Sequence, residues 1–178
     1  MLKIAILGAE STGKSDLAQK LAKHFKTVWV KEYAREYLEH KTEKYTYTDI
    51  LAIAQGQYQK TQEAIKNNPD RDYIFFDTEL LVTKIWAEYV FRMCHPWILD
   101  HLSNQDFDLY LLTNIDLPWE EDPLREHPEP EKRIELHHLY KQNLIDLGFS
   151  FAEISGIGSE RVQNAIDIIE NLKLEKEC

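Results

Sequence analysis

Short runs of apolar and β-branched residues recur along the chain, separated by longer stretches in which apolar residues return every three or four positions. Short runs of this kind are typical of buried strands, and the longer stretches are typical of helices that bury one face. The predicted strands are Lys3–Leu7, Thr27–Lys31, Tyr73–Phe76, Leu109–Leu112 and Ser150–Ile154. The predicted helices are Lys14–His24, Thr48–Asn67, Glu79–Met93, Glu131–Leu147 and Ser159–Leu172. Strands that alternate with helices predict an α/β fold with a five-stranded parallel sheet flanked by helices.

One long segment follows neither pattern. Asn114–Pro130 holds four of the six prolines among acidic residues, which is the composition of a loop. Loops of this length inside a domain usually have a function, so we predict a lid around residues 114–133. A chain of 178 residues has the size of one domain, and we predict a single domain over residues 1–178. The final residues, Leu174–Cys178, fall outside the pattern and are expected to fray.

The composition narrows the range of partners. The formal net charge is −10, from 31 acidic and 21 basic residues, so most of the surface would repel nucleic acid and anionic membranes. The apolar runs, such as Ile4–Leu7, are far shorter than the roughly 20 residues that span a bilayer, and no signal-peptide pattern opens the sequence. We therefore expect a cytoplasmic protein with a small-molecule substrate, and a homo-oligomer stays open. Cys94 and Cys178 have neither disulfide nor metal-ligand spacing, and we interpret both as incidental thiols.

The most specific motif lies between the first predicted strand and the first predicted helix. Residues 8–15 read Gly-Ala-Glu-Ser-Thr-Gly-Lys-Ser, which matches the phosphate-binding P-loop pattern in the structural context that the motif requires. Its amide groups and the positive end of the helix would face a phosphate, Lys14 would reach the β- and γ-phosphates, and the Ser15 hydroxyl would ligate magnesium. A glycine turn without a ligand is the weaker alternative. The residues expected to contact the nucleotide here are Gly8, Glu10, Ser11, Thr12, Gly13, Lys14 and Ser15.

Two acidic residues follow predicted strands and are candidates for metal binding and proton transfer. Asp77 ends the third strand, at the edge where parallel sheets hold their ligands, and we predict that it completes the magnesium site with Ser15. Glu32 ends the second strand, on the side from which an acceptor hydroxyl would approach. Either Glu32 or Asp77 could be the general base. The alternatives are a helix-capping role for Asp77 and a solvated helix start around Glu32, Arg35 and Glu36.

Arginines on the predicted lid suit a reaction that moves phosphate. Arg125 and Arg133 would bring positive charge to the transferring phosphoryl group when the lid closes, so we predict Arg125 as catalytic and Arg133 as nucleotide-binding. Both could instead neutralise the surrounding acids, and for Arg133 the sequence slightly favours that surface role. After the fifth strand, the glycine-containing loop Ser155–Arg161 returns to the same edge of the sheet and could cradle an adenine.

Aromatic and amide side chains flank the second and third strands, where an acceptor ring could bind. Tyr58 follows Gln55 by three residues, which gives a mixed polar and aromatic helix face that suits a heterocycle. Trp86 and Tyr89 have helical spacing and are expected in the core. His95-Pro96 is expected to break a helix.

Taken together, these residues resemble the ribosylnicotinamide kinase domain of the NadR-type bifunctional NAD-biosynthesis proteins. The similarity covers nearly the whole chain. It rests on the P-loop, Glu32-Tyr33-Ala34-Arg35-Glu36, Gln55 to Gln57-Tyr58, Phe75 to Thr78, His95-Pro96, and Trp119, Asp122 and Arg125 in a Trp-x-x-Asp-x-x-Arg pattern.

The resemblance implies a three-layer P-loop NTPase fold of the nucleoside-kinase type. It also implies transfer of the γ-phosphoryl group of ATP, with Mg²⁺, to the 5′-hydroxyl of nicotinamide riboside, which gives the mononucleotide. The substrate-binding residues that it suggests are Glu32, Tyr33, Arg35, Gln55, Tyr58, Asp77, Trp119 and Asp122.

Two departures from the family leave alternatives open. The sequence lacks the adenylyltransferase signature of the larger members, so we expect only the kinase step. Lys31 stands where the family tends to have an aromatic residue, and a lysine beside a cationic pyridinium would be unfavourable. Another nucleoside or a vitamin alcohol therefore stays open as the acceptor. A P-loop ATPase that acts as a nucleotide-dependent regulatory switch is the alternative function.

Overall fold

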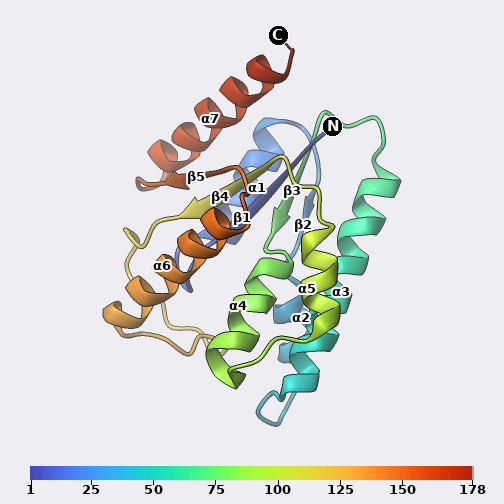
Figure 1. Cartoon of the computed structure of the whole chain (residues 1–178). Helices are drawn as coiled ribbons and strands as arrows, with labels where there is room; N and C mark the ends of the chain where they lie inside the picture. Colours follow the sequence, from blue (N-terminus) through green and yellow to red (C-terminus); the bar gives the residue numbers. More distant parts are fainter. Residues whose placement is uncertain (178) are drawn as a thin grey trace.

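A parallel β-sheet forms the middle of the computed structural model, which describes residues 1–177 (Figure 1). Within these residues the sheet has five strands in the order β2-β3-β1-β4-β5, and every neighbouring pair is parallel. The strands are β1 Leu2–Leu7, β2 Trp29–Val30, β3 Tyr73–Asp77, β4 Leu109–Thr113 and β5 Phe151–Ile154. The predicted α/β class and the five-stranded parallel sheet are confirmed.

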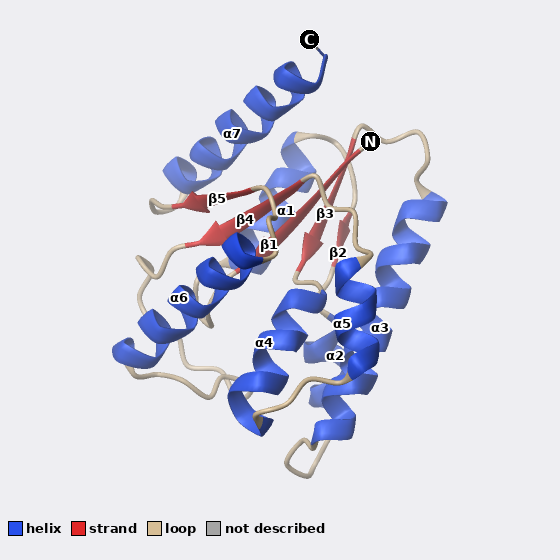
Figure 2. Cartoon of the chain, viewed as in Figure 1, coloured by secondary structure: helices blue, strands red, loops and turns tan. Residues whose placement is uncertain are grey.

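Helices cover both faces of this sheet (Figure 2). They are α1 Lys14–His24, α2 Tyr33–Glu39, α3 Tyr47–Asn67, α4 Leu80–Phe91, α5 Pro96–Ser103, α6 Pro130–Asp146 and α7 Ser159–Glu177. Side chains alternate across β1, so Ile4 and Ile6 pack with α1 and α7, whereas Ala5 and Leu7 pack with α3, α4 and α6. The result is the expected arrangement of three layers, with buried apolar clusters on both sides of the sheet.

Two helices were not predicted as separate elements. The sequence predicts a break at His95-Pro96, and the structure has this break between α4 and α5. The His95 ring nitrogen Nδ1 caps α5 by accepting a hydrogen bond from the Trp97 amide at 3.1 Å. Pro96 takes the first helical position, where a backbone N–H would have no partner within the helix. Helix α2 begins at Tyr33, directly after Glu32. The alternative of a helix start around Glu32 is therefore correct as secondary structure, and it does not exclude a functional role.

The C-terminal expectation needs a correction. Residues 174–177 continue α7 instead of fraying, and its helical pattern simply extends beyond Leu172. Cys178 lies outside the described residues. Cys94 is half-buried, and burial raises the pKa of its thiol to about 11, which fits an unreactive side chain. None of the helices within residues 1–177 has the length and apolar character needed to cross a membrane.

The carboxyl ends of the central strands place the predicted motifs together. Ile6 pairs with Asp77 and Leu7 with Leu112, so β1, β3 and β4 end side by side. The P-loop follows β1, and the predicted lid leaves β4 and runs without helix or strand until α6. Gly8 is required at the start of the loop: its φ is +145°, and an added Cβ would overlap Thr113 Oγ1 and lie 2.9 Å from the Thr113 carbonyl oxygen.

We predict that Gly8→Ala destabilises the fold more than Gly148→Ala. Both positions have positive φ, which costs an alanine about 1–2 kcal/mol, but nothing lies within 4 Å of an added Cβ at Gly148. The clash with Thr113 should add about 1–3 kcal/mol at Gly8. Urea unfolding of the two variants measures the difference, and equal losses of free energy would show that the close approach is not a constraint.

Candidate functional site

A cavity of about 530 Å³ opens at the carboxyl edge of the sheet. One end is formed by the P-loop and the other by apolar and aromatic side chains of α2, α4 and α6. The lid covers the space between them. The lining residues include Gly8–Asp16, Glu32, Ala34, Arg35, Leu38, Tyr45, Val82, Ile85, Trp86, Tyr89, Leu124–His127, Leu136 and Tyr140. The cavity therefore joins a phosphate-binding loop to a pocket large enough for a second small molecule.

The P-loop has the geometry that an anion needs. Gly13 caps α1 in the left-handed conformation with φ +74°, and no side chain caps the helix, so its first amide groups are available to a ligand. Lys14 Nζ donates to the carbonyl oxygens of Gly8 at 3.1 Å and Ala9 at 2.9 Å, which keeps the ammonium folded over the loop. Thr12 points inward instead, with its hydroxyl 2.8 Å from the Ala9 carbonyl oxygen and 2.7 Å from Thr113 Oγ1. Its side chain fixes the shape of the loop.

Ser15 and Asp77 meet as predicted for a magnesium site. The Ser15 hydroxyl donates to Asp77 Oδ2 at 2.5 Å, and Asp77 Oδ1 is buried without a hydrogen-bond partner. Burial raises the pKa of Asp77, while Ser15 and Lys14 lower it. A hydroxyl and a carboxylate with a free oxygen fit the oxygen ligands of Mg²⁺. Residues 1–177 contain no cluster of three or more acidic, histidine or cysteine side chains that could hold a metal alone, so the ion would share its ligands with phosphates and water.

Glu32 lies close to the predicted magnesium site. It precedes α2 as its N-cap, without a capping hydrogen bond, and it lines the cavity. Burial raises the pKa of Glu32, Lys14 lowers it and Asp77 raises it again, so the two carboxyl groups and the lysine are within electrostatic reach of one another. The structure thus brings both candidate bases to the P-loop.

The predicted lid is bound to the P-loop through two residues that the sequence assigned to the nucleotide. The Glu10 carboxylate accepts from the Glu126 amide at 3.0 and 3.1 Å and from the His127 amide at 2.9 Å. The Ser11 hydroxyl donates to the Pro118 carbonyl oxygen at 3.2 Å and accepts from the Glu120 amide at 2.9 Å. Both side chains are therefore engaged with the lid in this conformation.

The two predicted arginines have different environments. Arg125 lines the cavity, and its guanidinium donates to the Glu120 carbonyl oxygen and, at 3.4 Å, to the Ser11 hydroxyl. Arg133 is only 6% exposed and donates to the carbonyl oxygens of Ser11 at 3.1 Å and Leu117 at 3.2 Å. The surface role that the sequence slightly favoured for Arg133 is wrong, because its side chain is buried and its hydrogen bonds go to loop carbonyl oxygens. Its Nε is buried without a partner.

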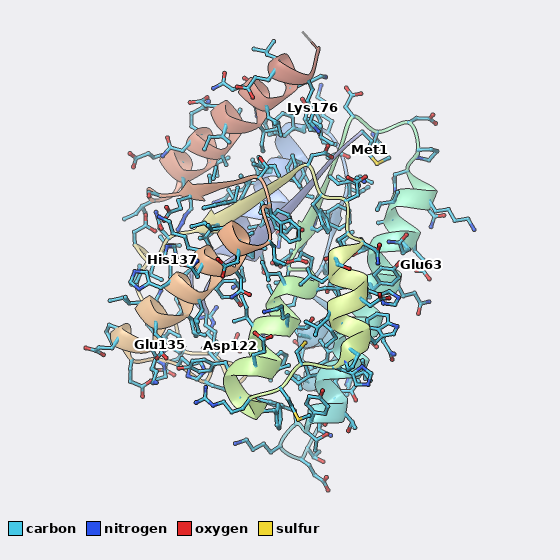
Figure 3. The ribbon with its side chains drawn as sticks, viewed as in Figure 1. Met1, Glu63, Asp122, Glu135, His137 and Lys176 are labelled. Atoms are coloured by element: carbon cyan, nitrogen blue, oxygen red, sulfur yellow. The ribbon has the colours of Figure 1, made fainter. Side chains whose placement is uncertain are left out.

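Trp119 and Asp122 do not line the cavity, and both contact arginines. The guanidinium groups of Arg125 and Arg133 each lie 5.8 Å from the centre of the Trp119 ring. Asp122 pairs with Arg35 at 2.9 Å, which links the lid to α2. In Figure 3, Asp122 lies in the lower half of the view, whereas Lys176 of α7 lies near the top.

The other end of the cavity is an aromatic pocket that sequence reasoning largely missed. Trp86 and Tyr89, expected in the core from their helical spacing, line it together with Tyr45. Trp86 Nε1 donates to the Tyr45 hydroxyl at 3.1 Å, and this hydroxyl donates to Glu126 Oε2 at 2.6 Å. Helical spacing cannot distinguish a core from a cavity wall, and Tyr45 lies in a polar loop with no motif.

Three predicted acceptor residues lie beside the cavity and not in its wall. Gln55 is exposed on α3, and the ring of Tyr58 packs edge-on against Trp97 and His101, with ring centres 5.6 and 4.9 Å away. The ring of Tyr33 rests on α3 at Gly56. Gln57 is buried instead, with its amide bonded to the backbone of Tyr33 and Thr78, because residues two apart on a helix point in nearly opposite directions.

Lys31 does not enter the aromatic pocket. Its side chain is exposed, and the ammonium lies 5.9 Å from the centre of the Trp29 ring. The unfavourable contact between this lysine and a cationic ring, which the sequence raised, therefore does not arise in the aromatic pocket.

The loop that the sequence suggested for adenine binding is tied to the start of the lid. The buried Arg161 donates to the Asn114 carbonyl oxygen at 2.9 Å and to Asp116 Oδ1 at 2.7 Å, and the Gly156 amide donates to Asp116 Oδ2 at 2.7 Å. These bonds hold the loop after β5 beside the end of β4. Its contact with an adenine stays a prediction.

We predict that Asp77→Asn removes the magnesium dependence of ATP binding. The wild-type protein should bind ATP about tenfold more tightly with Mg²⁺ than without, because a charged carboxylate completes the ion's ligands. The variant should bind equally in both conditions. Titration calorimetry measures both affinities, with Asp106→Asn, an exposed aspartate away from the cavity, as the control. An Asp77→Asn variant that keeps the magnesium effect would exclude the proposed ion site.

Comparisons with known proteins agree with this geometry. A family model described as AAA domain matches residues 3–161. The chain is 31% identical over 155 residues to the trifunctional NAD biosynthesis/regulator protein NadR of Escherichia coli (strain K12), and 30% identical to that of Salmonella typhimurium. Each match covers 85% of this chain and 37% of the relative, so the chain spans little more than a third of the length of these curated relatives. The resemblance to NadR-type proteins is confirmed.

Solved structures show the same fold. A NadR protein in complex with NR superimposes with a TM-score of 0.80 at 22% identity, covering 96% of this chain and 49% of that chain. Deoxyadenosine kinase from M. mycoides gives 0.65 at 19% identity, covering 96% and 100% of the two chains. Thymidylate kinase from Ehrlichia chaffeensis gives 0.69 at 12% identity, covering 94% and 98%. The predicted fold of a P-loop nucleoside or nucleotide kinase is therefore confirmed.

Proposed function

The chain belongs to the AAA domain family, and from this premise we propose that it is an ATP-dependent kinase that phosphorylates the 5′-hydroxyl of nicotinamide riboside. The product would be nicotinamide mononucleotide. Two similarities support this proposal: curated relatives are NAD biosynthesis proteins, and a protein of the same fold was solved with NR. Since the chain matches only 37% of those relatives, the proposal covers the kinase step alone.

The observation that carries the proposal is that one cavity contains both a phosphate-binding end and an aromatic end. Its P-loop end can hold the phosphates of ATP, and its aromatic end offers a second binding site under the same lid. A regulatory ATPase needs a positioned water and has no use for an aromatic pocket, whereas a kinase needs an acceptor beside the γ-phosphate. Glu32 is within electrostatic reach of Lys14 at one end and Tyr140 at the other.

The donor half would use the P-loop. The amides at the start of α1 and the Lys14 ammonium would bind the β- and γ-phosphates. Ser15 and Asp77 would hold Mg²⁺, which supplies charge that neutralises the phosphates when it is bound. Gly8 and Gly13 allow the backbone to approach the anion closely.

Glu32 is the better candidate for the general base. The Asp77 carboxylate accepts a hydrogen bond from the Ser15 hydroxyl. The Glu32 side chain makes no capping hydrogen bond to the backbone of α2, and it lines the cavity. Burial raises the pKa of both carboxyl groups, which suits either of them to accept a proton, so the choice rests on the hydrogen bond that engages Asp77 and not Glu32. In this role Glu32 would orient the 5′-hydroxyl toward the γ-phosphate and take its proton.

The lid would supply positive charge and exclude water. Arg125 lines the cavity near the P-loop, where its guanidinium could stabilise charge on the transferring group. Arg133 would act through the loop, because its contacts are with the carbonyl oxygens of Ser11 and Leu117. The Arg35–Asp122 pair would fasten the lid over the acceptor.

The aromatic pocket suits a positively charged ring. Tyr45, Trp86 and Tyr89 offer aromatic surface, and cations bind favourably to such surface. The Glu126 carboxylate borders the pocket, held by the Tyr45 hydroxyl at 2.6 Å, and adds a negative charge. Lys41 and Lys44 also line the cavity, and Lys41 is paired with Asp49, so the attraction for a pyridinium ring comes from the aromatic rings and Glu126.

We predict that the wild-type protein releases ADP when nicotinamide riboside is present and not when it is omitted. Lys14→Ala should lower the acceptor-dependent rate by about 100-fold or more, because the charge on the β- and γ-phosphates loses its partner. A coupled ADP-release assay measures both rates, and circular dichroism checks that the variant is folded. Release of ADP without any acceptor would favour an ATPase and contradict the proposal.

We also predict a preference for the charged ring over its neutral reduced form, dihydronicotinamide riboside. In Glu126→Gln the ratio of kcat/KM values for the two ribosides should fall about fivefold, since a charge at short range contributes about 1 kcal/mol in a hydrated site. Glu129→Gln, an exposed lid variant outside the cavity wall, should keep the wild-type ratio. An unchanged ratio in Glu126→Gln would show that this carboxylate does not recognise the ring.

A further inference from the structure

The amide of Gln57 is buried beneath the site, and both of its ends are used. The side chain belongs to α3 and is only 2% exposed. Its Oε1 accepts from the backbone amide of Tyr33 at 2.7 Å, and its Nε2 donates to the Thr78 carbonyl oxygen at 3.4 Å. The two partners lie on segments far apart in the sequence that are joined through this one side chain.

Each partner is the residue directly after a candidate catalytic acid. Tyr33 follows Glu32, and Thr78 follows Asp77. The first bond reaches the amide at the start of α2, and the second reaches the turn between β3 and α4. A single rigid amide therefore spans the two backbone positions from which the carboxyl groups extend.

The start of α2 is pressed closely against α3 at this point. An added Cβ at Gly56 would lie 2.5 Å from Cζ of the Tyr33 ring, so only glycine permits the contact. One turn further on, Lys60 lies 5.2 Å from the centre of the same ring and pairs with Glu36. The backbone that carries Glu32 is thus placed by α3.

The turn after Asp77 also requires support. Thr78 has φ +70°, a conformation that costs a β-branched residue energy and persists only where its surroundings hold it. Its amide donates to the Ile6 carbonyl oxygen at 3.0 Å, which fixes one side of the peptide. Gln57 holds the other side through the Thr78 carbonyl oxygen.

We propose that Gln57 is a positioning residue that sets the separation between Glu32 and Asp77. It touches neither substrate nor metal, and it acts by fixing the two segments that present these acids. This inference rests on the proposed kinase function, because a defined separation matters only if both groups act on the same phosphoryl transfer. Misplacement of a reacting group by about 1 Å can lower a rate about 100-fold.

A purely structural role would have a different signature from a positioning role. A buried amide also stabilises the fold, so loss of stability alone decides nothing. Burial is the largest cause of the raised pKa of Glu32; Asp77 and Glu10 also raise this pKa, whereas Lys14 and Arg35 lower it. Water that enters a loosened site removes part of the largest cause and should therefore lower the pKa of Glu32. The base must be deprotonated, so the rate falls as the pH drops through this pKa. In a variant that holds Glu32 and Asp77 less firmly, the acidic limb of the plot of kcat against pH should move to lower pH.

The test compares Gln57→Met with Gln59→Met in the full chain, with ATP and nicotinamide riboside. Gln59 is on the same helix, and its amide bonds only to Glu63 at 2.8 Å. Gln57→Met should lower kcat about tenfold, leave the KM for ATP within about twofold, and shift the acidic limb to lower pH. Gln59→Met should behave as the wild type.

Two further variants separate positioning from stability. Ile50→Val removes a buried methylene from α3 without touching either bond of Gln57, so it should lose about 1 kcal/mol of stability but keep kcat and the pH profile. Gln57→Glu keeps the acceptor for the Tyr33 amide and, when ionised, loses the donor to Thr78, so its kcat should lie between those of the wild type and Gln57→Met. This second substitution also serves if Gln57→Met fails to fold.

The outcomes distinguish the two levels of the proposal. If the wild-type protein does not phosphorylate nicotinamide riboside, the proposed function fails and this inference fails with it. If the wild type is active but the Gln57 variants keep its kcat and pH profile, positioning by Gln57 is wrong and the kinase function stands. The same conclusion follows if Ile50→Val reproduces both the loss of kcat and the shift of the acidic limb.

Discussion

Parallel pairing of β1 between β3 and β4 is the constraint on which the site depends. Because the strands run in the same direction, their carboxyl ends meet at one edge, and the register that joins Ile6 to Asp77 brings Ser15 to the end of β3. A shift of one residue would turn each buried side chain to the other face of the sheet. The P-loop, the magnesium ligands and the lid all begin at this edge.

The second determinant is the contact between the P-loop and the lid. Glu10 and Ser11 bind backbone groups of the lid, and Arg133 returns from α6 to bind the loop. Donor and acceptor ends are connected further by Glu126, whose amide reaches Glu10 and whose carboxylate reaches Tyr45. A movement of the predicted lid would therefore change both ends of the cavity together, which would suit a reaction that must begin only when both substrates are present.

Local sequence patterns predicted the parts of the molecule that local physics determines. The strand-loop-helix context identified the P-loop, and the position of Asp77 at the end of a buried strand identified its meeting with Ser15. The aromatic pocket could not be predicted in this way. Trp86 has the same helical spacing as a core residue, and whether its neighbour is protein or cavity depends on how α4 packs against the loop that holds Tyr45.

The same limit explains the difference between Gln55 and Gln57. Both belong to one helix and to one motif, but only the tertiary contact with Tyr33 decides which amide is buried. Arg133 shows the reverse case, since acidic neighbours in the sequence suggested a surface ion pair, whereas the fold directs its guanidinium to loop carbonyls. Resemblance to NadR-type proteins compensated for some of these gaps, because it pointed to an acceptor that no single pattern could identify.

The central claim is that donor and acceptor occupy one cavity with Glu32 between them. A crystal structure with Mg²⁺, a non-hydrolysable ATP analogue and nicotinamide riboside would test it most directly. The account predicts that the nicotinamide ring lies among Tyr45, Trp86 and Tyr89. The ribose 5′-oxygen should lie about 3–3.5 Å from a carboxylate oxygen of Glu32 and from the γ-phosphorus atom of the analogue. A riboside bound outside this cavity, or with its 5′-hydroxyl turned away from Glu32, would contradict it.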